Sequence, residues 1–170
     1  PVTNISSSFE FIGGGYILRV PVPIYIMLLC AVISHILLKH TRYGKYVYAI
    51  GGNQQAAIVS GINVKKYLIM VYTFAGIMSA VSGIVLASRL SAGQPTAGVN
   101  YELDAIASAV IGGTSLAGGI GTIPGTIIGA LIIGVLNNGL ILLNVSPYVQ
   151  QVLKGVIIVT AVLIDKRKKR

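Results

Sequence analysis

A few polar side chains stand among long apolar runs in this sequence, and their chemistry is that of ion pairs and hydrogen bonds. Glu102 and Asp104 follow Asn100 at the start of a short helical run, where the helix dipole favours acids. Lys154 lies in the outer part of a later apolar run. A charge in such surroundings usually has a partner, so Lys154 should either pair with Glu102 or Asp104 or snorkel to the outer surface. The residue types leave both interpretations open.

Hydroxyl and amide groups stand at two further places in the apolar sequence. Thr114 and Ser115 lie within GGTSLAGGIGT, residues 112–122, and their hydroxyls suit hydrogen bonding to a polar solute. Asn137 and Asn138 lie inside another apolar run, where amides bond between helices more often than they contact a solute. The candidates for lining a pathway are Glu102, Asp104, Gly113, Thr114, Ser115, Gly118, Asn137, Asn138 and Lys154.

Motifs for hydrolytic, metal-dependent or nucleophilic catalysis are missing from the sequence. It contains no HExxH, CxxC or GxSxG, so we assign no catalytic residue and no metal ligand. The run from Gly113 to Gly119 resembles a phosphate-binding loop only in its glycines, because the lysine and hydroxyl of GxxxxGK[ST] are missing. We therefore expect no cofactor on this chain and no enzyme activity. If a nucleotide supplies energy, another subunit binds it.

The composition is that of an integral membrane protein. Of 170 residues, 54% are hydrophobic and only 10% are charged, with a mean hydropathy of +0.82. The net charge of +9 comes mainly from residues 39–66 and 166–170. Such clusters at the ends of apolar runs favour contact with anionic lipid and retention in the cytoplasm, and not nucleic-acid binding.

The apolar runs predict an all-α, polytopic membrane helix bundle that forms one domain. Short loops rich in Lys and Arg stay on the cytoplasmic side, so residues 39–66 and the C-terminus should face the cytosol and Pro95 the outside. Residues 1–20 read as an outer loop, and the start at Pro1 suggests that N-terminal spans are missing. The spans are predicted at 22–38, 67–90, 123–143 and 148–164, with a half-span at 103–117.

The half-span is predicted from the number of membrane crossings that the two predicted sides require. Pro95 and the C-terminus are predicted on opposite sides, so the chain between them must cross the membrane an odd number of times. The two full spans in that interval would leave the C-terminus outside. A broken or re-entrant helix at 103–117 must therefore carry the chain inward, with the glycine-rich stretch at membrane depth, buried by protein or lining a water-filled cavity.

Small residues predict close helix packing on two of the spans. Gly121, Gly125 and Gly129 form overlapping GxxxG units, with Gly134 and Gly139 further along. Small residues four apart also mark the span 67–90, at Ala75, Ser79, Gly83 and Ala87. Each of these faces should pack on another helix.

Within the basic loop, residues 54–60 predict a short helix between the breakers Gly51, Gly52 and Asn53 on one side and Gly61 on the other. Such a helix could dock on another protein, or the loop could be only a solvated connector.

Several motifs in this sequence combine into a recognisable pattern. TRYGKYVYAIGGNQQAAIVSGINV and RLSAGQPTAGVNYELDAIASAVIGGTSLAGGIGTIPGTIIGALIIGVLNNGL, followed by the last apolar run, resemble the permease subunit of bacterial ABC importers for monosaccharides, ribose type. The match extends over nearly the whole chain and corresponds to the C-terminal part of such a permease. The resemblance implies a multi-pass protein of the bacterial inner membrane.

The resemblance also implies partners and a coupling segment. The partners would be a cytoplasmic ATP-binding subunit, an extracytoplasmic sugar-binding protein and a second permease copy. The segment that docks on the ATPase would include Gly52, Asn53, Gln55, Ala56, Ala57, Ser60 and Gly61. Gln55 and Ile58 stand where many relatives have Glu and Arg, which lowers the docking charge.

An alternative function is a stand-alone channel or secondary transporter that uses the broken helix as its site. An ion-coupled carrier is expected to place a carboxylate at mid-membrane. All four acids of this sequence, Glu10, Glu102, Asp104 and Asp165, lie at span boundaries or outside spans.

Overall fold

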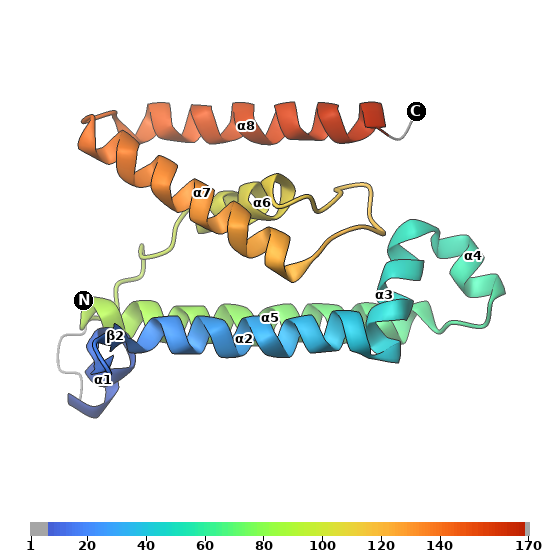
Figure 1. Cartoon of the computed structure of the whole chain (residues 1–170), viewed down its shortest axis with the longest axis horizontal. Helices are drawn as coiled ribbons and strands as arrows, with labels where there is room; N and C mark the ends of the chain where they lie inside the picture. The colour runs from blue at the N-terminus through green and yellow to red at the C-terminus, as the bar shows by residue number, and fades with distance from the viewer. Residues whose placement is uncertain (1–6, 169–170) are drawn as a thin grey trace.

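The computed structural model describes residues 7–168, and most of this range is helical (Figure 1). This confirms the predicted all-α class, with one short β-hairpin added. The elements are α1 (Ser7–Gly14), β1 (Tyr16–Ile17), β2 (Val20–Pro21), α2 (Val22–His40), α3 (Arg42–Gly52), α4 (Gln54–Val59), α5 (Val64–Leu90), α6 (Tyr101–Ile111), α7 (Ile123–Leu142) and α8 (Pro147–Lys168).

Three helices in the described part of the chain, α2, α5 and α7, are long and apolar enough to cross a membrane. They overlap the predicted spans 22–38, 67–90 and 123–143. The apolar part of α8, Pro147–Leu163, is shorter, and α6 has 11 residues. The passage of each element through the bilayer stays a prediction.

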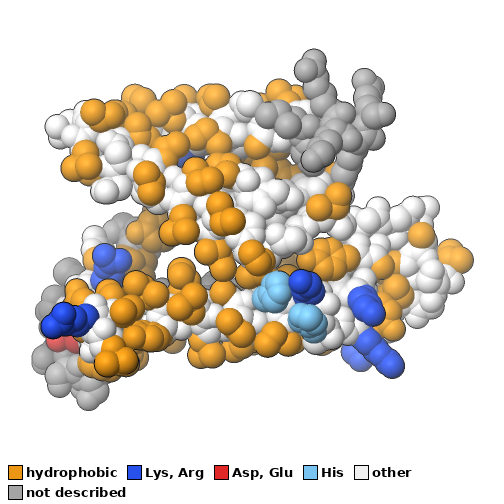
Figure 2. Space-filling model, viewed as in Figure 1, with side chains coloured by type: hydrophobic (Ala, Val, Ile, Leu, Met, Phe, Trp, Pro, Cys, Tyr) orange, Lys and Arg blue, Asp and Glu red, His pale blue; other side chains and the backbone are white. Residues whose placement is uncertain are grey.

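The surface of the bundle is apolar and its buried core is small. The buried hydrophobic side chains are Ala57, Val64, Ala107, Val110 and Ile133, whereas Leu131, Val135 and Leu142 are each more than 60% exposed. Hydrophobic side chains cover most of the face in Figure 2. Contiguous apolar surface on this scale marks contact with a membrane or another protein.

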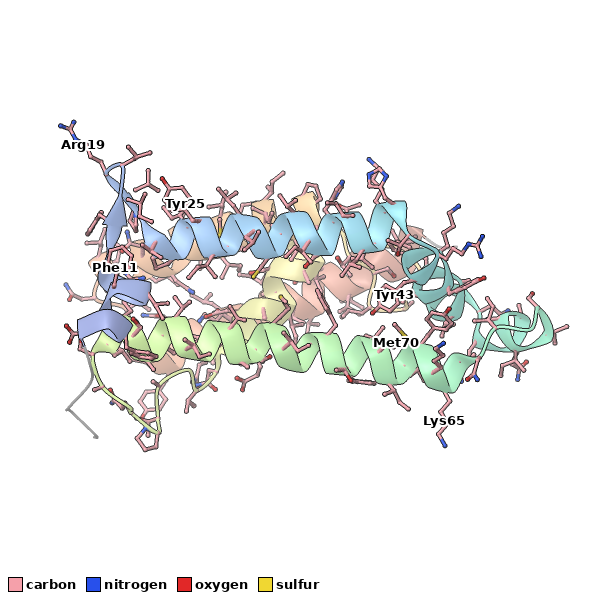
Figure 3. All side chains as sticks on the ribbon, turned by 90° about the horizontal axis from the view of Figure 1, so that it is seen from below. Phe11, Arg19, Tyr25, Tyr43, Lys65 and Met70 are labelled. Carbon is pink, nitrogen blue, oxygen red and sulfur yellow. The ribbon has the colours of Figure 1, made fainter. Side chains whose placement is uncertain are left out.

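The helices form two layers, with α2 and α5 in one and α6, α7 and α8 in the other (Figure 1). In the second layer α6 packs on both α7 and α8. In the first, α2 and α5 run side by side (Figure 3), with α1 against both helices at one end and α3 against both at the other. We call these the α1 end and the α3 end. The last turn of α8 and the α3–α4 corner lie at the same end.

The segment before the first span was predicted to be a loop, and this was wrong. Residues 7–14 form α1, and a hairpin pairs Tyr16 with Pro21. The Ser88 hydroxyl accepts a hydrogen bond from the Gly13 N–H at 2.7 Å, and a Cβ added to Gly13 would collide with the Arg89 backbone. Glycines that resemble loop residues in sequence here permit a close helix contact.

The basic loop 39–66 is more ordered than a connector. Beyond the predicted short helix, which appears as α4, residues 42–52 form α3. The Thr41 side chain caps α3 by accepting from the Gly44 N–H, and the Tyr46 and Tyr67 rings lie 5.0 Å apart between α3 and α5. Burial raises the pKa of the Tyr43 phenol above its ordinary value. Sequence reasoning missed α3.

Of the four small residues of α5 that were predicted to pack on another helix, three lie on the surface of the described chain and Ala87 is half-buried. Ala75, Ser79 and Gly83 are exposed, and a Cβ on Gly83 would meet no atom within 4 Å. Their predicted packing partner is not among the described residues.

Candidate functional site

The pairing interpretation of Lys154 is confirmed. Its amine lies 2.6 Å from Asp104 Oδ1, and the lysine is only 8% exposed. The contact joins the second turn of α8 to the first turn of α6, and Glu102 is exposed on the same helix. The opposite charge of Asp104 offsets part of the cost of burying the lysine charge. The structure thus shows pairing with Asp104, and not snorkelling.

The predicted glycine packing holds for the first half of α7. Gly125 lies against the Gly112 carbonyl and Gly129 against the Ser108 carbonyl, so close that a Cβ on either would collide with α6. A Cβ on Gly121 would lie 2.9 Å from Thr114 Oγ1. Gly134 and Gly139 meet no atom within 4 Å, and their predicted contact is not made in the described chain.

The two asparagines of α7 differ in exposure. Asn137 is half-buried, and its Oδ1 has no hydrogen-bond partner among the described residues, whereas Asn138 is exposed. A buried amide oxygen without a partner can accept a hydrogen bond from a solute, water or another chain. The pathway role of Asn137 stays a prediction, and Asn138 lies on the surface.

The glycine-rich stretch, residues 112–122, begins with a helix-ending turn. The Gly113 N–H donates to the Val110 carbonyl at 3.0 Å and the Thr114 N–H to the Ala109 carbonyl at 2.9 Å, with Gly113 at φ +89°. Ser115 is 7% exposed, and its N–H donates to the Ile120 carbonyl at 3.0 Å. The stretch is therefore a folded loop whose conformation is held by hydrogen bonds of its own backbone and of the end of α6.

The glycine-rich stretch reaches the α3 end of the bundle, and its depth in the membrane stays a prediction. Gly118 and Gly119 lie against Gly51 and Gly52 of α3, and the Tyr48 hydroxyl donates to the Gly121 carbonyl at 2.7 Å. From the α1 end, the connection after α5, then α6 and this stretch carry the chain to the α3 end, and α7 returns it (Figure 1). The chain therefore runs from one end of the bundle to the other between α5 and α7, and whether this segment crosses the membrane stays a prediction.

The predicted coupling segment forms the corner between α3 and α4. Asn53 Oδ1 accepts from the Ala56 N–H at 3.0 Å, and Gly61 ends the helix at φ +80°. Gly52, Asn53, Gln55, Ala56 and Ser60 are exposed, but Ala57 is only 4% exposed. Ala57 faces its own chain and cannot present its side chain to a partner.

Sequence reasoning missed several residues of this region. Val59 is 89% exposed and Ile58 is 55% exposed, so the surface of α4 is more apolar than its small residues suggested. Tyr48 and Gly51 were missed because their partners lie about 70 positions away in the chain. The pair Gly118–Gly119 was the available signal, since adjacent glycines often mark close backbone approach.

Comparison with known proteins identifies the family. The family model for the permease component of the branched-chain amino acid transport system matches residues 1–162. The ribose import permease protein of Bacillus subtilis (strain 168) is 53% identical over 170 residues, which cover 99% of this chain and 53% of that protein. The ribose import permease protein of Escherichia coli (strain K12) is 52% identical over 167 residues, covering 98% of this chain and 52% of that protein.

A more distant relative is named for a different sugar. The xylose transport system permease protein of Haemophilus influenzae is 45% identical over 163 residues, covering 94% of this chain and 44% of that protein. The chain thus spans about half the length of these relatives. No solved structure gives a significant match. Because the family model matches nearly the whole sequence, this chain belongs to the family of branched-chain amino acid transport system permease components.

Proposed function

We propose that this chain is part of the transmembrane permease subunit of an ATP-driven importer that passes a monosaccharide, ribose or a close analogue, into the cytosol. The single observation that carries the proposal is the identity of 52–53% to ribose import permeases across nearly the whole chain. The family description names branched-chain amino acids, but it is a weaker guide to the substrate of this chain than the close relatives are. The relatives with similar sequences also include a xylose transport permease.

Polar side chains on α6 and its neighbours support the proposal that a polar solute passes next to α6. The Asp104–Lys154 ion pair, the half-buried Asn137 and the hydroxyls of Thr114 and Ser115 lie on α6, α7, α8 and the glycine-rich stretch, which pack together. Gly113 and Gly118 shape the backbone of that stretch by their positive φ angles. Sugar hydroxyls both donate and accept hydrogen bonds, so carboxylate, amine, amide and hydroxyl groups suit their passage.

The proposed importer needs partners that supply energy and substrate. ATP would bind a separate cytoplasmic subunit, and this chain would hold no cofactor and perform no catalysis. An extracytoplasmic sugar-binding protein would deliver the sugar, and a second permease copy would complete the pathway. Docking of α4 on the ATPase is supported by its exposed Ala56, Ile58 and Val59 and by an apolar groove between α4 and α5 of about 740 Å³.

The proposed location is the bacterial inner membrane, with several spans and a cytoplasmic C-terminus. Supporting this orientation, the basic loop 39–66 and the end of α8 lie at the same end of the bundle (Figure 1), while the chain leaves α5 for Pro95 at the other end. The alternative of a stand-alone channel or secondary transporter is not favoured, because the relatives are permease components of transport systems.

A transport assay tests the proposal. Deleting the gene for the permease that contains this chain should abolish high-affinity uptake of labelled ribose, and the intact gene on a plasmid should restore it. Xylose and arabinose serve as comparison sugars that define the range of the importer. Unchanged uptake of all three sugars in the deletion strain would contradict the proposed function.

A further inference from the structure

Two glycines at the end of α3 lie directly against two glycines of the glycine-rich stretch. A Cβ added to Gly51 would lie 2.7 Å from the Gly119 nitrogen, and one added to Gly119 would lie 2.9 Å from the Gly52 Cα. A Cβ on Gly118 would collide with the Gly51 carbonyl oxygen. We call these four residues the glycine contact. The two backbones touch without intervening side chains, so neither segment can shift toward the other without displacing it.

A hydrogen bond holds the same two segments in register. Tyr48 lies one turn before Gly51 on α3, and its hydroxyl donates to the Gly121 carbonyl at 2.7 Å. The tyrosine is half-buried, and the partners are 73 residues apart in sequence. This bond adds a directional restraint to the glycine contact, because hydrogen bonds weaken steeply when their geometry changes.

Both sides of the contact continue into fixed structure. On one side Asn53 joins α3 to α4: its N–H donates to the Ala49 carbonyl at 3.0 Å and its Oδ1 accepts from the Ala56 N–H at 3.0 Å. On the other side the glycine-rich stretch continues from α6, which is held to α7 at Gly112 and to α8 through Asp104. A displacement of α4 can therefore be passed through residues in direct contact to the residues of the candidate pathway.

We propose that Tyr48 is a positioning residue that, together with the glycine contact, transmits movement of α4 to the glycine-rich stretch during transport. The proposal rests on the proposed function, in which α4 meets the ATPase. At a contact between backbones, no side-chain rotamer is available to absorb a small shift. The Tyr48 hydroxyl keeps the two segments moving as one body.

The first test removes only the hydroxyl. The full-length permease would be reconstituted in liposomes with its ATPase subunit and binding protein, and sugar uptake and ATP hydrolysis would be measured in the same sample. A hydrogen bond of ordinary net strength changes an equilibrium roughly 2- to 13-fold, so Tyr48→Phe should lower the sugar imported per ATP by about that factor. Tyr148→Phe, at a residue 81% exposed on α8, is the matched control and should keep the wild-type ratio.

The amount of sugar imported per ATP distinguishes a positioning role of Tyr48 from a role in the stability of the complex. A purely structural role for Tyr48 would lower the yield or melting temperature of the complex and leave the sugar imported per ATP unchanged. We expect the opposite, with ATPase subunit retention and melting temperature close to those of Tyr148→Phe.

A second pair of variants tests the glycine contact. Gly113 and Gly118 have nearly the same backbone conformation, with φ of +89° and +88°, but only a Cβ at Gly118 would collide with α3. Alanine at either position carries the same conformational strain, so the difference between the two variants reports the contact. Gly118→Ala should lower the sugar imported per ATP further than Gly113→Ala. Equal ratios in these two variants would contradict a role for the contact.

A direct readout follows movement itself. An environment-sensitive fluorophore at Leu116, which is 54% exposed, reports on the glycine-rich stretch, and one at the exposed Gln55 reports on α4. ATP should change both signals in the wild type. In Tyr48→Phe the Gln55 signal should persist and the Leu116 signal should fall. If both labels respond to ATP in Tyr48→Phe as in the wild type, the proposed link is overturned.

Failure of this inference is distinguishable from failure of the proposed function. A wild-type complex that hydrolyses ATP but imports none of the sugars tested contradicts the function. A wild-type complex that imports sugar, with Tyr48→Phe matching Tyr148→Phe in ratio, contradicts only the link.

Discussion

Lys154 Nζ lies 2.6 Å from Asp104 Oδ1, which ties α8 to the first turn of α6 inside an otherwise apolar bundle. The side chains are 10% and 25% exposed, respectively. An ion pair this far from water is costly to break from one side, because the remaining charge has no partner. It also places both charges next to the proposed path, where a polar solute could meet them.

Removing one charge of this pair should destabilise the permease more than removing both. Breaking a buried pair from one side costs about 3 to 5 kcal/mol, and the 25% exposure of Asp104 favours the lower part of that range. We expect Lys154→Met to lower the melting temperature of the full-length permease in detergent, and Asp104→Asn with Lys154→Met to recover part of the loss. Glu102→Gln, at an exposed residue of the same helix, is the stability control. A double variant as unstable as the sum of the two single variants would argue against coupling between the side chains.

The α6–α7 contact should respond to a single methyl group. A Cβ at Gly129 would collide with the Ser108 carbonyl, whereas one at Gly134 meets nothing within 4 Å. Overpacking costs about 1 to 3 kcal/mol, so Gly129→Ala should lower the melting temperature of the permease. Gly134→Ala should leave it unchanged or raise it, because alanine favours a helix over glycine by about 1 kcal/mol. Equal effects of the two substitutions would show that this close approach is absent from the full-length protein.

The orientation of the bundle can be measured with single cysteines in a background that lacks Cys30. Gln94 lies in the turn between α5 and α6, and Asn53 lies at the α3–α4 corner. An impermeant thiol reagent applied to intact cells should label a cysteine at Gln94, and one at Asn53 or Lys168 only after the cells are opened. Labelling of Asn53 but not of Gln94 in intact cells would reverse the orientation.

A bulky residue on the exposed face of α4 should weaken docking of the ATPase subunit. Ala56 is exposed and Ala57 is buried, so Ala56→Trp changes the surface without filling the interior of the chain. The cost of overpacking a fitted contact, about 1 to 3 kcal/mol, corresponds to a loss in association of roughly 5- to 150-fold. We expect less ATPase subunit to co-purify with Ala56→Trp and less stimulation of ATP hydrolysis by the loaded binding protein.

The control for this experiment is Tyr148→Trp, at an exposed position on α8 away from α4. Gly61→Trp is less informative, because Gly61 has φ +80° and a side chain there strains the helix end itself. If Ala56→Trp keeps both subunit retention and full stimulation, α4 is only a connector between α3 and α5.

Local signals in the sequence determined the class, the family and much of the helix pattern. The apolar runs, the glycine-rich break after Ile111 and the short helix after Asn53 each depend on neighbouring residues, and the structure contains all three features. The helices at residues 7–14 and 42–52 were missed because burial of α1 against α5, and of α3 against α2 and α5, outweighs their own weak preferences.

Only the tertiary structure decided which distant residues meet. Sequence left Lys154 with two acids and the outer surface as alternatives, and the packing of α8 on α6 selected Asp104. The sequence did not indicate that Tyr48 would bond to Gly121 or that Gly51 would contact Gly118. These contacts depend on the position of the glycine-rich stretch relative to α3. Composition and periodicity describe each element along the chain, whereas the partner of a side chain is set by the relative position of elements far apart in that chain.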